Sequence, residues 1–429
     1  MPPFPRKQAS LPSRNAADLR GAGKLTIDAI TGVTDLVEAV HANILGLPGI
    51  LGTSTTMSTR GIPGTVYRSV RGVTRLVGSG IDLALAAFAP LLDRAMPIPQ
   101  REAVLAALNG VLGDHLAATG NPLAISMRLR HAGEALVLDR ESLARMFPQA
   151  SPRVLVFAHG LCMNDLQWNY GGQDRGTALA DDLGYTPVHL HYNTGLPVSG
   201  NARAFSGLLQ QLVEAWPVPV QDLAIVGHSM GGLVARGACV VAQQDGDTWL
   251  SRLGKLVFLG TPHHGAPLER AGSWVDLLIG LSPYTAPFAR LGSIRSAGIR
   301  DLRHGNIRDE DGARKGRRHK SGKAEGGLND GGRQTDNDGY RDSRIPSPLP
   351  AHVQAYAVAA TTQAARTGID LDGLRGDGLV RIASAFGQHA DRRFTLRIPA
   401  ARRMLAYRTN HLELLGSAEV YARLRRWLA

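Results

Sequence analysis

The chain has 429 residues, of which 44% are hydrophobic and 20% are charged, so it has the length and the composition of a globular protein with a substantial core. Its formal net charge of +12 would favour polyanions or anionic membranes. However, no zinc-type cysteine cluster, helix-turn-helix pattern or aromatic–basic stripe indicates nucleic-acid binding, and an arginine-rich solvated surface explains the charge more simply.

The first 120 residues are predicted to be a flexible tail followed by a helical N-terminal region. Residues 1–23 are rich in proline, serine and arginine, as flexible tails are. Residues 24–120 carry apolar side chains at helical spacing, for example at Val66, Val70, Val73, Val77 and Ile81, and again at Val104, Leu105, Leu108, Val111 and Leu112. The helix over 66–81 is also basic, so it either packs on the neighbouring domain or lies on a membrane surface.

Strands alternate with helices over residues 121–429, which form the predicted catalytic domain. A polar–apolar alternation on both sides of a short turn predicts a hairpin over 126–138. Further strands are predicted over 153–158, 187–192, 223–226, 255–259, 353–360 and 394–398, and helices over 201–216 and 417–428. This order predicts the α/β class, with a mostly parallel sheet, helices on both faces, and ligands at the carboxyl ends of the strands.

Two segments interrupt this domain. Residues 266–300 hold apolar side chains suited to covering a pocket, and we expect either a cap or lid there or simple helix packing. Residues 304–347 are dense in glycine and charged side chains and have almost nothing to bury, which predicts a disordered insertion. Its basic run over 314–320 is either an anion-binding or localisation tract or, more simply, part of a solvated loop.

The most informative motif is GHSMG over residues 227–231. It follows an apolar run and precedes a helix-compatible stretch, which is the strand–turn–helix context of a nucleophile elbow. Gly227 and Gly231 leave room for the strained turn and for the closely packed helix. Ser229 is therefore the predicted nucleophile of a serine hydrolase.

A serine hydroxyl needs a histidine base that is oriented by a carboxylate, and in this order of elements both follow the serine in sequence. Asp377 lies in a loop between glycines and is preferred to Asp370 and Asp372, which lack that glycine frame. His411 follows the last predicted strand and precedes the terminal helix, so it is the predicted base. His389 precedes that strand and is not favoured.

Two backbone N–H groups are predicted to stabilise the oxyanion of the tetrahedral intermediate. One belongs to Met230, directly after the nucleophile, and the other to Leu161, in the loop after the strand over 153–158. Gly160 gives that loop backbone freedom, and His159 is expected to brace it.

Several other residues near these motifs are expected to have structural roles. They include His228, which lies beside the nucleophile, and the pair His263 and His264. Cys162 could be a reactive thiol but is more simply a small buried residue. With Cys239 it provides no disulfide framework, which fits a reducing compartment.

These motifs together resemble the lipase branch of the α/β-hydrolases, and they are similar to bacterial triacylglycerol lipases and to GPI inositol-deacylase (PGAP1)-like proteins. The resemblance rests on the motifs at 159–160, 227–232, 260–265, Asp377 and His411, and covers residues 124–429. It implies an α/β-hydrolase fold and hydrolysis of carboxylic esters through an acyl-enzyme, often with apolar acyl chains. It also places Glu413 where some bacterial lipases have a calcium ligand, but no second ligand is evident, so we expect no metal and no cofactor.

The sequence thus predicts an esterase or lipase acting on a small-molecule or lipid ester. An acyltransferase, a thioesterase or an amidase could use the same triad, because specificity lies in the pocket rather than in the fold. The helical N-terminal region and the basic charge also leave open a non-catalytic protein that binds a membrane or a partner. No signal-peptide pattern and no apolar run of transmembrane length is found, which predicts a cytoplasmic protein with or without peripheral membrane contact.

Overall fold

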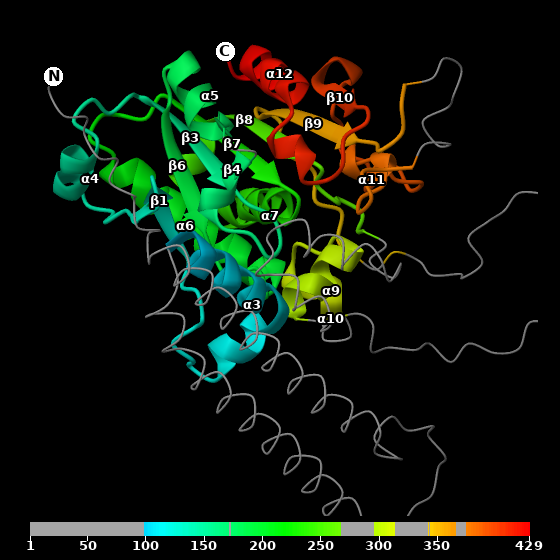
Figure 1. Ribbon diagram of the computed structural model, residues 1–429, viewed down its shortest axis with the longest axis horizontal. Helices are drawn as coiled ribbons and strands as arrows, with labels where there is room; N and C mark the ends of the chain where they lie inside the picture. The colour runs from blue at the N-terminus through cyan, green and yellow to red at the C-terminus, as the bar shows by residue number, and fades with distance from the viewer. Residues whose placement is uncertain (1–97, 171–172, 267–295, 314–341, 343, 366–374) are drawn as a thin grey trace, which may run out of the picture.

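The computed structural model of the chain describes residues 98–170, 173–266, 296–313, 342, 344–365 and 375–429 (Figure 1). The predicted tail, the helices expected before residue 98, the basic run over 314–320 and most of the expected cap lie outside these residues. The roles assigned to residues 1–97 therefore stay predictions. In the part of the chain that the structure describes, no helix combines the length and the apolar character needed to cross a membrane.

An eight-stranded sheet with the order β10-β9-β8-β7-β3-β6-β1-β2 forms the centre of the molecule. Neighbouring strands from β10 to β6 are parallel, whereas β1 runs antiparallel to both β6 and β2. The inner strands are continuous apolar runs because both of their faces are covered. The strands are β1 (Arg128–His131), β2 (Glu134–Ala135), β3 (Arg153–Ala158), β6 (Thr186–His191), β7 (Asp222–His228), β8 (Leu253–Leu259), β9 (Gln354–Ala360) and β10 (Arg403–Ala406).

Helices cover both faces of this sheet (Figure 1). On one face α5 (Arg175–Leu183) packs against α12 (Ala418–Leu428), and on the other α6 (Val198–Ala215) packs against α7 (Met230–Asp245). In α12 the buried side chains follow helical spacing, and the Ser417 hydroxyl caps its first turn by accepting from the Val420 N–H. The predicted parallel α/β sheet with helices on both faces is confirmed.

The helix α3 (Ile98–Ala118) is part of the same packed unit, although the predicted domain boundary near residue 120 would separate it. Its apolar stripe is buried in the common core. The Asn109 side chain joins it to the following segment, since Nδ2 donates to Leu123 O at 2.8 Å and Oδ1 accepts from Ile125 N at 2.9 Å. Helical periodicity predicted one buried face, whereas every residue from 102 to 113 is buried, and it could not indicate what the helix packs against.

Parts of the segment predicted as a disordered insertion, 304–347, are ordered. Helix α9 (Ala297–His304) is followed by α10 (Asp309–Ala313), and Asp311 is buried. The Asp311 carboxylate accepts from Ile307 N at 3.0 Å and from Ile345 N at 2.9 Å, so it holds the two ends of the segment together. Composition missed this order because hydrogen bonds to a single carboxylate provide it, rather than a run of apolar residues.

The last strand is β10, and the strand predicted over 394–398 is absent from the structure. Phe394, Leu396 and Ile398 are buried at alternate positions, which produces the strand-like pattern. Their backbone instead forms local turns, and Ile398 N donates to Leu396 O at 2.9 Å. β10 takes the edge position and pairs in parallel with β9.

Candidate active site

Ser229 lies at the sharp turn between β7 and α7. Its φ of 54° and ψ of −122° are rare for any residue other than glycine, so the surrounding chain must hold this conformation. Two contacts explain the flanking glycines. A Cβ at Gly227 would lie 2.6 Å from Gly232 Cα, and a Cβ at Gly231 would lie 2.2 Å from Ala158 O. The motif therefore forms the strand–turn–helix that its sequence predicts.

His411 and Asp377 form a buried pair on neighbouring loops. Nδ1 of His411 lies 2.7 Å from Oδ2 of Asp377, and both residues are almost fully buried. The other carboxylate oxygen accepts from Leu379 N at 2.9 Å and from Val380 N at 2.7 Å. The backbone adds a third link, since His411 N donates to Asp377 O at 3.1 Å. With the Nδ1 proton donated to the carboxylate, Nε2 of His411 is left to accept a proton.

The backbone on either side of His411 is also fixed. Oδ1 of Asn410 accepts from Leu412 N and Glu413 N, and Oε2 of Glu413 accepts from Asn410 N at 2.8 Å. Nε2 of His228 lies 3.0 Å from His411 O. Burial lowers the pKa of His228 well below its usual range, so the ring is neutral and donates its Nε2–H to this carbonyl. His228 and Glu413 thus hold the turn that carries His411, and Glu413 belongs to no group of three metal-binding side chains in the described ranges.

The two predicted oxyanion donors lie beside Ser229. Met230 is the first residue of α7, where a helix leaves its N–H without an internal acceptor. Leu161 lies in the loop after β3, and within the described residues no hydrogen bond engages either N–H. A Cβ at Gly160 would lie 3.1 Å from Ser229 Cβ, so glycine lets this loop approach the serine closely.

A narrow pocket brings these groups together. Ser229, His411 and Leu161 line it, so the candidate nucleophile, base and oxyanion loop face one space. The remaining walls are mostly apolar side chains, from Met163, Pro262, Ala266, Leu302, Leu379 and Val380.

His159 lies behind this loop in a position suited to the bracing role expected of it. Its ring stacks on that of Tyr192 with the centroids 4.5 Å apart, and the Tyr192 hydroxyl donates to His159 O at 2.9 Å. Burial lowers the pKa of His159 to about 3, so the ring is neutral near pH 7. Tyr192 belongs to no motif and was predicted only as the last residue of the strand over 187–192, whereas β6 ends at His191.

His263, His264 and His389 do not line this pocket. His263 is fully buried edge-on against Phe258, with ring centroids 4.5 Å apart, and His264 Nδ1 lies 3.2 Å from Nη2 of Arg344. His389 packs on His264. Burial raises the pKa of the Cys162 thiol, which fits a structural residue. The rival carboxylates, Asp370 and Asp372, lie outside the described residues.

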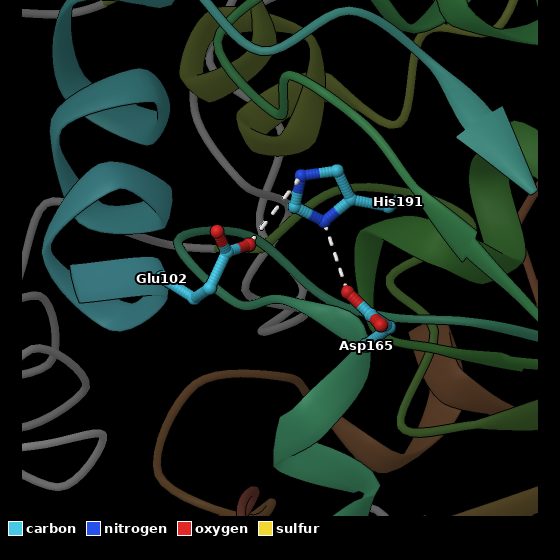
Figure 2. A group of neighbouring side chains, drawn as sticks. All are labelled: Glu102, Asp165 and His191. Carbon is cyan, nitrogen blue, oxygen red and sulfur yellow. Dashed lines mark ion pairs between the residues drawn. The ribbon is translucent and has the colours of Figure 1, made fainter. Parts of the chain in front are cut away.

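A second buried cluster of charged side chains was not predicted. It consists of Glu102, Arg130, Asp165 and His191. Figure 2 shows Glu102, Asp165 and His191 converging from separate segments. The available signals were weak: an acidic residue within an apolar helix, and a histidine that ends an apolar strand.

Comparisons with known proteins agree with the resemblance seen in the sequence. Residues 207–307 match the family model described as PGAP1-like alpha/beta domain, a range that includes Ser229 but not Asp377, His411 or α3. No curated protein matches the chain. Together with the sheet order and the elbow, this match confirms the predicted α/β-hydrolase fold.

Solved structures that are similar to the chain include lipases and esterases. The mature lipase BlEst2 of Bacillus licheniformis has 18% identity, covers 66% of this chain and 93% of its own, and gives a TM-score of 0.40. The Pyrobaculum calidifontis esterase has 13% identity, with 65% and 75% covered and a TM-score of 0.37. Carboxyl esterase 2 of the fungus Tuber melanosporum has 14% identity, with 65% and 77% covered and a TM-score of 0.36.

Proposed function

We propose that this protein is a serine hydrolase that cleaves carboxylic esters through an acyl-enzyme, with Ser229 as nucleophile, His411 as base and Asp377 as the orienting carboxylate. The observation that carries the proposal is that His411, held by Asp377 at 2.7 Å, lines the same pocket as Ser229 at the tip of a strained elbow. A structural role alone would not require a serine in that backbone conformation.

The residues suggest the following sequence of steps. Oγ of Ser229 attacks the ester carbonyl carbon while Nε2 of His411 takes its proton, and the carbonyl oxygen becomes an oxyanion. The N–H groups of Leu161 and Met230 stabilise this oxyanion. When the intermediate collapses, the bond to the alcohol breaks and His411 donates the proton to the departing alkoxide. Water then attacks the acyl carbon while His411 takes its proton, the bond between the acyl carbon and Oγ of Ser229 breaks, and His411 returns the proton to Oγ, which releases the acid and the free serine.

The pocket favours an apolar acyl group. Its walls beyond Ser229 and His411 offer mainly hydrocarbon side chains, such as Leu302 and Leu379, and burial of apolar surface stabilises binding by about 25 cal/mol per Å². We therefore propose small-molecule or lipid esters with an apolar acyl chain as substrates. Peripheral membrane contact is proposed on the basic, amphipathic sequence over 66–81 alone.

A p-nitrophenyl ester series from acetyl to palmitoyl tests this proposal with the wild type and Ser229→Ala. We expect the wild type to release p-nitrophenolate and the alanine variant to lose about 10⁴- to 10⁶-fold in kcat. The best chain length would separate an esterase from a lipase. Turnover that survives in Ser229→Ala would refute the nucleophile. Absence of turnover with every ester would favour an amide, thioester or non-water acceptor, or a binding role.

A further inference from the structure

The loop that carries the Leu161 N–H needs support because its backbone is strained. Cys162, the next residue, has a φ of 59°, in the left-handed region that non-glycine residues rarely adopt. Such a conformation costs of order 1 kcal/mol and persists only where the surroundings hold it. The direction of the Leu161 N–H therefore depends on what packs against this turn.

The helix α3 packs directly against it. Sγ of Cys162 lies so close to the helix that a Cβ at Gly110 would be 2.1 Å away, and it lies 3.8 Å from Ala107 O. On the other side, Cys162 N donates to Oγ1 of Thr194 at 3.1 Å. The turn is thus held between α3 and the segment that follows β6.

A chain of buried charges joins α3 to the far end of the same loop. Nη1 of Arg130 lies 2.9 Å from Oε2 of Glu102, on α3, and 3.0 Å from Oδ1 of Asp165, which begins the short helix η1 (Asp165–Trp168) after the loop. Nδ1 of His191 lies 3.0 Å from the same Asp165 oxygen (Figure 2). Burial raises the pKa of Asp165, but His191 and Arg130 together lower it to about 2, so the carboxylate is charged near pH 7.

The arrangement does not suit a metal ion, although Glu102, Asp165 and His191 offer three ligand atoms within 4.8 Å of one another. The Arg130 guanidinium is already at hydrogen-bond distance from both carboxylates, and it supplies the positive charge that a cation would bring. Removing one partner of a buried ion pair strongly destabilises a protein, because the other charge is left unpaired. The cluster therefore links α3, β1, β6 and the oxyanion loop in a fixed arrangement.

We infer that Glu102, Arg130 and Asp165 are positioning residues that hold the oxyanion loop at its working distance from Ser229, and that α3 is required for the full catalytic rate. This inference rests on the proposed function. It assigns a task to a helix that lies outside the residues matched by the family model.

The test uses Asp165→Asn and Glu102→Gln in the full-length protein, which keep the side-chain shapes and remove one charge each. We expect kcat to fall roughly ten- to a hundredfold while KM changes by less than about twofold, because a displacement of ~1 Å can cost about 10²-fold in rate. Ki for a trifluoromethyl ketone, whose hemiketal oxyanion occupies the oxyanion hole, should rise by the same factor as kcat/KM falls.

Two control variants separate positioning from general destabilisation. Glu141→Gln removes a charge from the exposed Glu141–Arg145 pair. Leu143→Ala removes a fully buried side chain of α4 (Arg140–Met146) that does not line the pocket, and it should lower the melting temperature. Neither should change kcat or Ki in the range where it is folded.

Several outcomes would overturn the inference. One is that folded Asp165→Asn and Glu102→Gln both keep the wild-type kcat and Ki. Another is that Leu143→Ala loses as much kcat as Asp165→Asn when the two variants have the same melting temperature. A third is a stoichiometric metal that co-purifies with the wild type and is lost in Asp165→Asn. If instead the wild type cleaves no ester, or Ser229→Ala retains activity, the proposed function itself has failed.

Discussion

Two buried aspartate–histidine pairs occur among the residues that the structure describes, and they differ in their neighbours. Nδ1 of His411 lies 2.7 Å from Oδ2 of Asp377, and Oδ1 accepts from two backbone N–H groups; in the described part of the chain no lysine or arginine pairs with this carboxylate. Asp165 and His191 lie 3.0 Å apart, but Arg130 binds that carboxylate and Glu102 lies on the other side of the imidazole. Both pairs are buried, but His411 lines the pocket beside Ser229, whereas Asp165 and His191 do not line that pocket.

An aspartate–histidine pair alone therefore does not define a catalytic site. A carboxylate held only by neutral donors can stabilise an imidazolium that forms during the reaction. A carboxylate already paired with a guanidinium offers little further stabilisation and serves instead to join segments.

Removing the charge of each aspartate should separate the two pairs most clearly. Asp377→Asn should lower kcat by about 10⁴-fold, because an amide cannot hold the imidazole in the required tautomer. Asp165→Asn should cost much less, in the range given above. The measurement is steady-state hydrolysis of the best p-nitrophenyl ester. Equal losses in the two variants would break the distinction between a catalytic and a positioning pair.

The backbone support of His411 can be tested at His228. His228→Phe removes the Nε2–H that donates to His411 O. The loss of one buried hydrogen bond costs about 1–1.5 kcal/mol, so kcat should fall about tenfold if the base is displaced accordingly. His263→Phe is the matched control, since this ring is also fully buried but bonds nothing in the described residues. Equal kcat in both variants would contradict the role of His228.

As the pH falls, the buried histidines should destabilise the fold at a higher pH than the aspartates do. Burial lowers the pKa of His159 to about 3 and that of His263 well below its usual range, whereas both would titrate near 6.5 in the unfolded chain. The unfolded state thus binds more protons below pH 6.5. The stabilising contribution is complete above that pH and is lost as the pH falls towards the folded-state pKa.

Each such histidine should reduce the free energy of unfolding by up to about 1.4 kcal/mol per pH unit. Urea unfolding at about pH 7 and about pH 5 should show this dependence. In His263→Phe the free energy of unfolding should depend less steeply on pH, by the contribution of one histidine. An unchanged slope in that variant would show that His263 is not held neutral. The Asp165 contribution follows the same sign but is lost only below about pH 3.8, its ordinary pKa.

The smallest effect is expected at Glu413. Glu413→Gln keeps an oxygen that can accept from Asn410 N, so kcat should change by less than about twofold. A chelator should likewise leave activity unchanged. A large loss in the variant, reversed by added calcium, would show that this carboxylate binds a metal instead of holding the turn.

The centre of the fold and the proposed triad could be predicted because their signals are local. Inner parallel strands are continuous apolar runs, the elbow is a pentapeptide, and the glycines around Asp377 mark its loop. The position of His411 followed from chain order, even though the strand before it is β10 and not residues 394–398.

What could not be predicted depends on contacts between distant segments. The apolar stripe of α3 predicts burial, but it does not predict that the Gly110 backbone contacts Cys162. Glu102 and Asp165 carry no motif, and their roles depend on one guanidinium from a third segment. The order around α10 likewise rests on Asp311, whose acceptor role is visible only once its donors are in place.

The central claim is that Ser229 is an activated nucleophile, and covalent labelling tests it most directly. The wild type is treated with the phosphate triester paraoxon, from which an activated serine displaces p-nitrophenolate, and its peptides are mapped by mass spectrometry. We expect one diethylphosphoryl group, on Ser229, with esterase activity lost in proportion, and much slower labelling in Asp377→Asn. Labelling of another residue, or full activity in a protein whose Ser229 is modified, would contradict it.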